Sequence, residues 1–416
     1  MPRHDLLVPS LIGGFHFVSL NWSRPIFALL AGQLGANEMM LGALTSVFYL
    51  LPLIIALPAG MLTDRWGARR LAAAGSASLV LGNVLYAVAT NFLALAAARV
   101  LCGLAQIVVL VAVQARVANL GKAGEQDRNF GTLFFFAGVG QLAGPLLAGF
   151  TSTAYGIRLS FAVGAVLALI PLAMSAWLPD APGLARKVVA MSADSARGAG
   201  AAARSTTPRM SVATVGRLLW IPGVRLGVGA SLILLLADGA RESLFPWFAA
   251  RSIGFDEATI GVLLSISALF SIAVQPFAGA LAKALGRTRV LSLAMFCGAA
   301  GMIAVPFART FWPMAGAMAL AGLCMGANQP PSMACVADSA PPELRGMAMS
   351  LRLAGNRVGL LLSPIWGGWL VAARGLSSYF FAAAVILGAG SAFVGTLAGG
   401  GLRAGPRART RPQAQT

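Results

Sequence analysis

Ionisable side chains inside the long apolar stretches of this 416-residue chain are the residues best suited to chemistry. Of the 13 acidic residues, only Asp238 and Glu242 lie well inside such a stretch. They are four positions apart, so on a helix they would share a face, with Arg241 close to Asp238. A carboxyl group partly removed from water can exchange a proton near neutral pH, as coupling to a proton gradient requires. We expect Asp238, the deeper of the two, to be the first candidate; the alternative is a salt bridge with Arg241 that only holds the helix in place.

Arginines and amides in the apolar stretches are candidates for a substrate cavity. They are Asn21, Arg24, Gln106, Arg241, Asn328, Gln329, Asn356 and Arg357. With Arg99, the arginines outnumber the two acids, which favours an anionic or zwitterionic substrate. Arg357 would lie near mid-membrane, where it could bind such a substrate or pair with an acid such as Asp238, whereas Arg352 could reach the cytoplasm. Pro330 and Pro331 should break the hydrogen-bond ladder of their helix and expose carbonyl groups to the cavity.

Other kinds of site find little support in the residue types. The four cysteines lie in apolar runs without CxxC spacing, and two scattered histidines are too few for a catalytic metal site. We find no nucleophile and base pair, no phosphate-binding loop and no basic patch with interleaved aromatics. The sequence therefore predicts no enzyme, no metal, no cofactor and no nucleic-acid partner.

The elements that must position these side chains are membrane-spanning helices. Hydrophobic residues make up 58% of the chain, charged residues only 11%, and the mean hydropathy is +0.79. Apolar runs of roughly 20 residues are long enough to cross a bilayer as helices. The pattern predicts an all-α integral membrane protein with about twelve spans, near residues 6–31, 40–62, 70–90, 93–117, 130–152, 157–178, 224–249, 258–282, 289–308, 311–336, 346–371 and 376–399.

An internal repeat divides these spans into two halves. Gly35, Glu38 and Gly42 match positions 219 residues later (254 − 35), and the offset holds over some seventy residues. We expect two pseudo-symmetric six-helix halves, residues 1–178 and 223–400. A cytoplasmic linker at 179–222, including a short interfacial helix from Val212 to Trp220, would join them, and a basic cytoplasmic tail would follow at 401–416.

The distribution of Lys and Arg predicts the orientation. The loops on the side of the termini hold about 22 basic residues and those on the other side only 4. Cytoplasmic loops retain positive charge, so both termini should be cytoplasmic.

One charged segment between two spans, Gly60-Met-Leu-Thr-Asp-Arg-Trp-Gly-Ala-Arg-Arg70, resembles the loop between helices 2 and 3 in the major facilitator superfamily. The resemblance covers residues 6–400 and implies a transporter that rocks one half against the other around a central site. Chemically, the segment suits a cytoplasmic latch: a carboxylate can accept hydrogen bonds from a neighbouring helix end, and arginines anchor at the inner membrane surface. The corresponding residues are Gly60, Asp64, Arg65, Gly67, Arg69 and Arg70. The second copy has Lys283 in place of Asp64, so we expect unequal latches.

Two further motifs resemble the same family. The fifth span carries Gly140, Gly144, Pro145 and Gly149, similar to the motif of the family's antiporters, which favours export. In the fourth span, Arg99 and a glycine four residues later resemble a pattern associated in the family with proton coupling. Gln106 lies on nearly the same face, so this span should present a polar stripe to the cavity; the alternative is that Arg99 extends to the outer interface.

The sequence thus predicts a monomeric secondary transporter of the cell membrane that works by alternating access. Its partners would be the lipid bilayer, a small organic substrate and protons, with proton-coupled export as the expected activity. Proton-linked or facilitated uptake of a metabolite is the main alternative, and a receptor or scaffold without transport is a remote one.

Overall fold

The computed structural model describes residues 4–118, 120, 126–178, 212–341 and 344–399. The first half consists of α1 (His4–Gln33), α2 (Glu38–Trp66), α3 (Ala68–Val88), α4 (Phe92–Ala118), α5 (Gln126–Tyr155), α6 (Ile157–Met174) and the short η1 (Ser175–Trp177). The second half consists of α8 (Val212–Trp220), α9 (Pro222–Asp238), α10 (Arg241–Phe248), η2 (Ala249–Ile253), α11 (Glu257–Leu285), α12 (Arg287–Ala304), η3 (Val305–Phe307), α13 (Phe311–Ser339), α14 (Arg345–Arg374) and α15 (Ser377–Gly399). The predicted all-α fold is confirmed.

Nine segments of the described chain are long and apolar enough to cross a membrane, and one of them, Pro222–Ile253, combines α9, α10 and η2. The helices α1, α13 and α14 fall outside this set because they carry more polar residues, but they are 30, 29 and 30 residues long. At 1.5 Å per residue, such helices exceed the ~30 Å hydrocarbon core. Nine and three together give the twelve predicted spans.

The repeat is visible in the backbone of the helix junctions. Six glycines have positive φ angles, and they form three pairs that are each 219 positions apart: Gly35 and Gly254, Gly67 and Gly286, Gly156 and Gly375. Each ends one helix or precedes the next, where glycine tolerates a backbone conformation that other residues avoid. The two halves therefore turn their chains at equivalent places.

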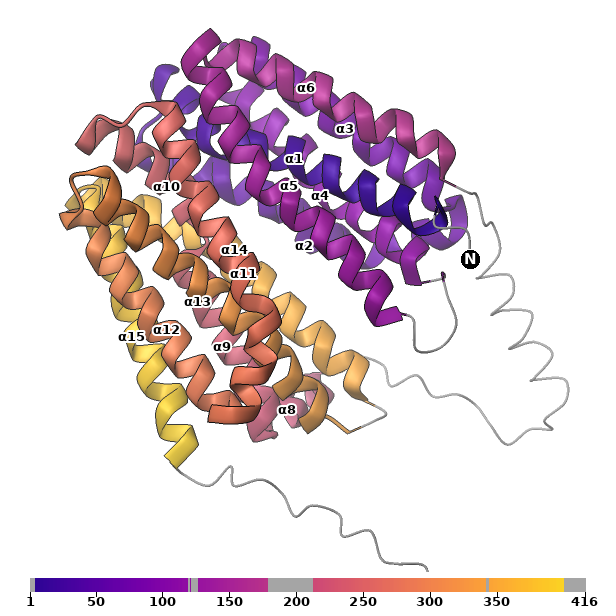
Figure 1. Ribbon diagram of the computed structural model, residues 1–416, viewed down its shortest axis with the longest axis vertical. Coiled ribbons are helices and arrows are strands. Elements are labelled where there is room, and N and C mark those ends of the chain that lie inside the picture. Colours follow the sequence, from indigo (N-terminus) through magenta and orange to yellow (C-terminus); the bar gives the residue numbers. More distant parts are fainter. Residues whose placement is uncertain (1–3, 119, 121–125, 179–211, 342–343, 400–416) are drawn as a thin grey trace, which may run out of the picture.

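The two halves form two helical bundles that lie side by side (Figure 1). They contact each other mainly through α1, α2 and α5 of the first half and α10, α11 and α14 of the second. The bundles meet at the end that carries the junctions at 34–37, 155–156, 254–256 and 375–376, and diverge toward the end that carries α8 (Figure 1). We call these the joined end and the open end.

Two local predictions have different outcomes. The helix from Val212 to Trp220 is present as α8. The expected break at Pro330 and Pro331 is wrong, because α13 continues through both prolines. Arg352 and Ser332 both donate to the Gln329 carbonyl in this region, at 3.5 and 2.9 Å, so side chains supply partners beside the prolines.

Candidate functional site

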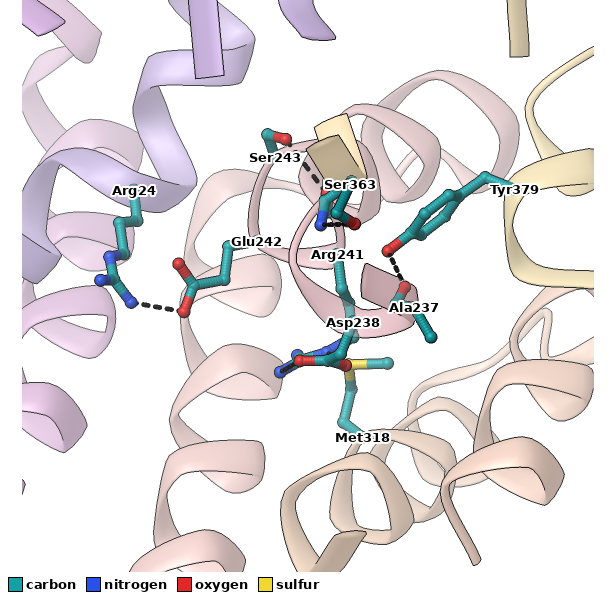
Figure 2. A network of polar contacts seen from close by, with 10 residues as sticks. Arg24, Ala237, Asp238, Arg241, Glu242, Ser243, Met318, Ser363 and Tyr379 are labelled. Atoms are coloured by element: carbon teal, nitrogen blue, oxygen red, sulfur yellow. Dashed lines mark hydrogen bonds and ion pairs between the residues drawn. The ribbon is translucent and has the colours of Figure 1, made fainter. Parts of the chain in front are cut away.

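An ion pair connects the two halves inside the bundle. Arg24 of α1 donates to the carboxylate of Glu242 of α10, and both side chains are partly buried (Figure 2). The pair borders a cavity of about 60 Å³, which is also lined by Asn21, Gln141 and Arg241. A second small pocket shares Arg24 and Glu242 with it. The site thus lies between the halves and brings together four of the predicted residues, Asn21, Arg24, Arg241 and Glu242.

A second ion pair lies within helix 7, the span formed by α9 and α10. The Arg241 guanidinium donates to both oxygens of Asp238, at 2.6 and 3.3 Å, and approaches the sulfur of Met318 at 3.9 Å. Both charged side chains are buried. The prediction that Asp238 and Glu242 share a face is wrong, because helix 7 is interrupted at Gly239 and the two carboxylates point toward different partners (Figure 2). The alternative, a salt bridge of Arg241 with Asp238, is the arrangement found.

Arg99 lies over two aromatic rings. Its guanidinium carbon is 3.6 Å from the ring centre of Phe27 and 5.2 Å from that of Phe48, and the side chain is buried. Extension of Arg99 to the outer interface is therefore wrong: the cation remains inside the bundle, where aromatic faces offer partial compensation for its charge. Arg99 lines the second pocket together with Arg24 and Glu242, so it belongs to the same site.

Arg352 is also buried, which corrects the expectation that it reaches the cytoplasm. Its Nη2 donates to Oε1 of Gln329 at 2.7 Å and to the Ser332 hydroxyl at 2.9 Å. Neutral oxygens on α13 hold the guanidinium within the second half, so both Arg352 and Gln329 are engaged away from the Arg24–Glu242 pair. Arg357 is half-buried, and Asp238 is paired with Arg241 rather than with it.

The remaining predicted amides are dispersed. Asn21 lines the cavity but donates to the Phe17 carbonyl of its own helix at 2.7 Å. Asn356 accepts from Ser231 within the second half. Gln106 and Asn328 are buried, and the Gln106 Oε1 and both amide atoms of Asn328 lack hydrogen-bond partners among the residues placed by the structure. Only Asn21 of these four therefore lies beside the ion pair.

Two equivalent contact lines, which we call seams, close the joined end. In the α2–α14 seam, Ser46 donates to the Leu361 carbonyl at 2.8 Å; in the α5–α11 seam, Ser265 donates to the Leu142 carbonyl at 2.8 Å. Glycines allow the helices to approach closely. A Cβ atom at Gly42 would overlap the Pro364 carbonyl oxygen, and one at Gly261 would overlap that of Pro145. Every residue of one seam is 219 positions from its counterpart in the other.

The predicted gating residues of α5 divide between two neighbours. Gly140 and Gly144 pack against α1 within the first half, whereas Pro145 and Gly149 pack against α11 across the α5–α11 seam. In the charged segment, Gly67 adopts a positive φ angle, and Arg69 and Arg70 are exposed. The side chains at Gly60, Asp64 and Arg65 lie outside the part of the chain that the structure describes. The predicted cytoplasmic latch therefore stays a prediction.

Several residues around the site escaped the sequence analysis. The Arg24–Glu242 pair itself joins residues 218 positions apart, and the rings that surround Arg99 come from α1 and α2. The helix 7 interruption is contacted by Ser363, Trp366 and Tyr379 of α14 and α15. A comparison of the two halves could have identified Ser363 and Tyr379 from the sequence. They stand where the first half has Gly144 and Ser160. Within the described residues, no group of three potential ligands could hold a metal ion.

Comparison with known proteins supports a transporter. "Multidrug resistance protein MdtG" of Rahnella is 34% identical over 127 residues, which are 30% of this chain and 31% of that relative's length. "Multidrug resistance protein 2" of Bacillus subtilis is 22% identical over 288 residues, 68% of each chain. Relatives such as the Rahnella protein therefore match over less than a third of their own length.

Solved structures support the same fold. The nucleoside transporter NupG has a TM-score of 0.74 at 14% identity and covers 94% of this chain and 99% of its own. A mutant of the peptide transporter POT in complex with sulfate has a TM-score of 0.73 at 16% identity, with coverage of 95% and 94%. The family model for the Major Facilitator Superfamily matches residues 10–240 and 227–415. The chain belongs to the major facilitator superfamily and is a multi-pass membrane transporter rather than an enzyme.

Proposed function

We propose that this chain is a proton-coupled secondary transporter of the cell membrane that exports a small organic compound by alternating access. The observation that carries the proposal is the Arg24–Glu242 ion pair, because its two partners come from the two halves and border the cavity between them. A charge that can be neutralised at this position would change how strongly the halves hold together. Charged side chains inside a bilayer are costly, so they are retained where they have a functional or structural role.

Orientation follows from the basic residues. They gather on the side of the termini, so we place the termini and the open end in the cytoplasm and the joined end outside the cell. The described arrangement then corresponds to an inward-facing state with its outer side closed. Each chain already contains both halves, so a monomer is sufficient for transport.

Glu242 is our preferred proton acceptor. It borders both pockets, whereas Asp238 is buried and bound through both oxygens to Arg241. Protonation of Glu242 would remove its charge, weaken its contact with Arg24 and release a cation toward the cavity. With Arg99 nearby, the released site would favour an anionic or zwitterionic compound. Asp238 then serves to neutralise Arg241.

Export is favoured by the multidrug resistance relatives and by the glycine and proline motif of α5. Uptake uses the same fold and the same inward-facing state, so direction requires a flux measurement. Proteoliposomes with an acidic lumen that contains a pH-sensitive dye provide such a measurement. Salicylate, norfloxacin and ethidium serve as anionic, zwitterionic and cationic probes.

Antiport predicts that at least one probe enters as protons leave, and that Glu242→Gln abolishes the proton flux. Glu38→Gln is the matched control, because Glu38 also faces a cation of the other half, Arg251, but at 3.7 Å and in a more exposed pair. Proton movement in the same direction as the probe would establish symport instead. Probe flux without proton movement would contradict coupling altogether.

A further inference from the structure

Helix 7 is interrupted between α9 and α10, and three side chains bind the backbone groups at the interruption. In a continuous helix, the N–H groups of residues 240 and 241 would donate to the carbonyls of Leu236 and Ala237. Instead, the Ala240 N–H donates to the Ser363 hydroxyl at 2.9 Å. The Leu236 carbonyl accepts from the Trp366 indole at 3.1 Å, and the Ala237 carbonyl accepts from the Tyr379 hydroxyl at 2.6 Å (Figure 2 shows the contacts of Ser363 and Tyr379).

Such substitutes are required inside a membrane, where an unpaired backbone group costs several kcal/mol. Ser363 and Tyr379 are buried, so water does not supply these bonds. Gly239 also permits the contact, because a Cβ atom there would approach the Ser363 Cβ to 2.9 Å. The neighbouring helices α14 and α15 thus provide both the space and the hydrogen-bond partners for the interruption.

The first half contains a natural comparison. Subtracting 219 from Ser363, Trp366 and Tyr379 gives Gly144, Leu147 and Ser160. Glycine and leucine side chains have no donor. The Ser160 hydroxyl is 2.8 Å from Thr151 and also accepts from Trp22, so it is occupied by other side chains. The equivalent helix, α1, is continuous from His4 to Gln33. The half without the three donors therefore has the uninterrupted helix.

The interruption determines where the charges point. Asp238, before it, binds Arg241 within the second half, and Glu242, after it, reaches Arg24 of the first half (Figure 2). We infer that three positioning residues, Tyr379, Trp366 and Ser363, stabilise the interruption of helix 7 at Gly239. The interruption in turn directs the Glu242 side chain toward Arg24. The functional meaning of this arrangement rests on the proposed role of Glu242, but the placement of residue 242 can be measured without transport.

The first experiment measures that placement. In the Arg24→Cys/Glu242→Cys protein, a short bis-methanethiosulfonate reagent reports how closely positions 24 and 242 approach. We expect Tyr379→Phe to slow cross-linking about 5-fold, equivalent to one lost hydrogen bond of about 1 kcal/mol. Tyr86→Phe is the control, because Tyr86 is equally buried and its hydroxyl lacks a partner among the described residues. Ser363→Ala, with Ser76→Ala as its control, repeats the test should Tyr379→Phe fold poorly; Ser76 is likewise buried, and its Oγ lacks a partner within the described part.

The second experiment separates positioning from general destabilisation. Ser265→Cys places a thiol in the α5–α11 seam, where a membrane-impermeant maleimide reacts only after the joined end opens. We expect Tyr379→Phe to raise the labelling rate about 5-fold when Glu242 is present and less than about 2-fold in Glu242→Gln, because a positioning residue loses its effect with the group that it positions. Equal effects in both backgrounds would assign Tyr379 a purely structural role.

The outcomes distinguish this inference from the proposed function. Unchanged cross-linking in both Tyr379→Phe and Ser363→Ala would overturn the inference. A second outcome would be slower cross-linking in Tyr379→Phe together with a Ser265→Cys labelling rate that Glu242→Gln alone leaves unchanged. It would support the positioning of residue 242 and contradict the role of the ion pair in closing the joined end.

Discussion

Ser46 and Ser265 occupy equivalent positions in α2 and α11, and each donates a 2.8 Å hydrogen bond to a leucine carbonyl of the opposite half. One helical turn before each serine lies a glycine, Gly42 or Gly261, that contacts the opposite half. The same short segment, used twice, therefore closes the joined end on both sides of the cavity.

Gly261→Ala should open this end. The added methyl group would overlap the Pro145 carbonyl oxygen and lie 3.1 Å from the Gly149 Cα, so the α5–α11 seam must separate. We expect maleimide labelling of Ser265→Cys to rise at least about 10-fold, since even 1 to 2 kcal/mol shifts a two-state equilibrium by this order. Gly388→Ala is the control, because its methyl group would meet nothing within 4 Å. Equal labelling in the two variants would show that the seam tolerates the methyl group.

The Arg24–Glu242 pair should depend on opposite charge rather than on residue identity. Arg24→Gln is expected to raise labelling of the same reporter on the order of 10-fold, because it leaves a partly buried carboxylate without its partner. The exchange Arg24→Glu/Glu242→Arg should restore labelling to within about 3-fold of the parent. Arg251→Gln, which removes a half-exposed pair across the same end, should change it less than about 2-fold. Failure of the exchanged pair to improve on Arg24→Gln would contradict a simple electrostatic contact.

Arg99→Lys should destabilise the first half. A lysine ammonium cannot stack on an aromatic ring as a planar guanidinium can, and the Arg99 guanidinium carbon lies over the Phe27 and Phe48 rings. A desolvated contact between a cation and a ring contributes about 2 kcal/mol. The measurement is the apparent thermal unfolding midpoint in detergent. Arg251→Lys provides the comparison, because Arg251 lies 3.9 Å from the Trp247 ring centre but is half exposed, where such a contact contributes about 0.5–1 kcal/mol. A midpoint for Arg99→Lys no lower than that for Arg251→Lys would argue against the aromatic enclosure.

The buried Gln106 and the half-buried Gln329 should respond differently to the same substitution. Gln329→Leu removes an acceptor 2.7 Å from the Arg352 guanidinium and is expected to cost about 1.5–3 kcal/mol. Gln106→Leu removes a buried oxygen that has no partner within the described residues, so the free energy of unfolding should fall by no more than about 0.5 kcal/mol. The unfolding midpoints test both values. If Gln106→Leu abolishes transport while its midpoint is retained, Gln106 acts on the substrate rather than on the fold.

The fold was largely predictable because its signals are local or periodic. Apolar runs set the spans, and the 219-residue offset located two halves whose glycine junctions, such as Gly35 and Gly254, prove equivalent. The offset also contained the seams, since Gly42 and Gly261 are repeat partners, as are Pro145 and Pro364. What it lacked was the information that Gly42 contacts Pro364 and Gly261 contacts Pro145, each across the two halves.

The site was less predictable because its geometry depends on tertiary contacts. Arg24 and Glu242 were both candidates, but no helical spacing relates residues of different halves. Periodicity placed Glu242 beside Asp238 because it assumes a continuous helix, and no proline stands at the interruption; Pro246 lies within α10. Likewise, Arg352 was expected to reach water because the neutral oxygens that hold it belong to another helix.

Because α1 has no counterpart of the helix 7 interruption, the two halves of the duplicated chain are not interchangeable. Both halves begin on the same membrane side, so two identical halves would present the same side chains to the cavity from each bundle. Three side chains that differ between otherwise equivalent positions, Ser363, Trp366 and Tyr379, remove that equivalence. Comparing one half with the other, position by position, is therefore a way to find specialised residues from a single sequence.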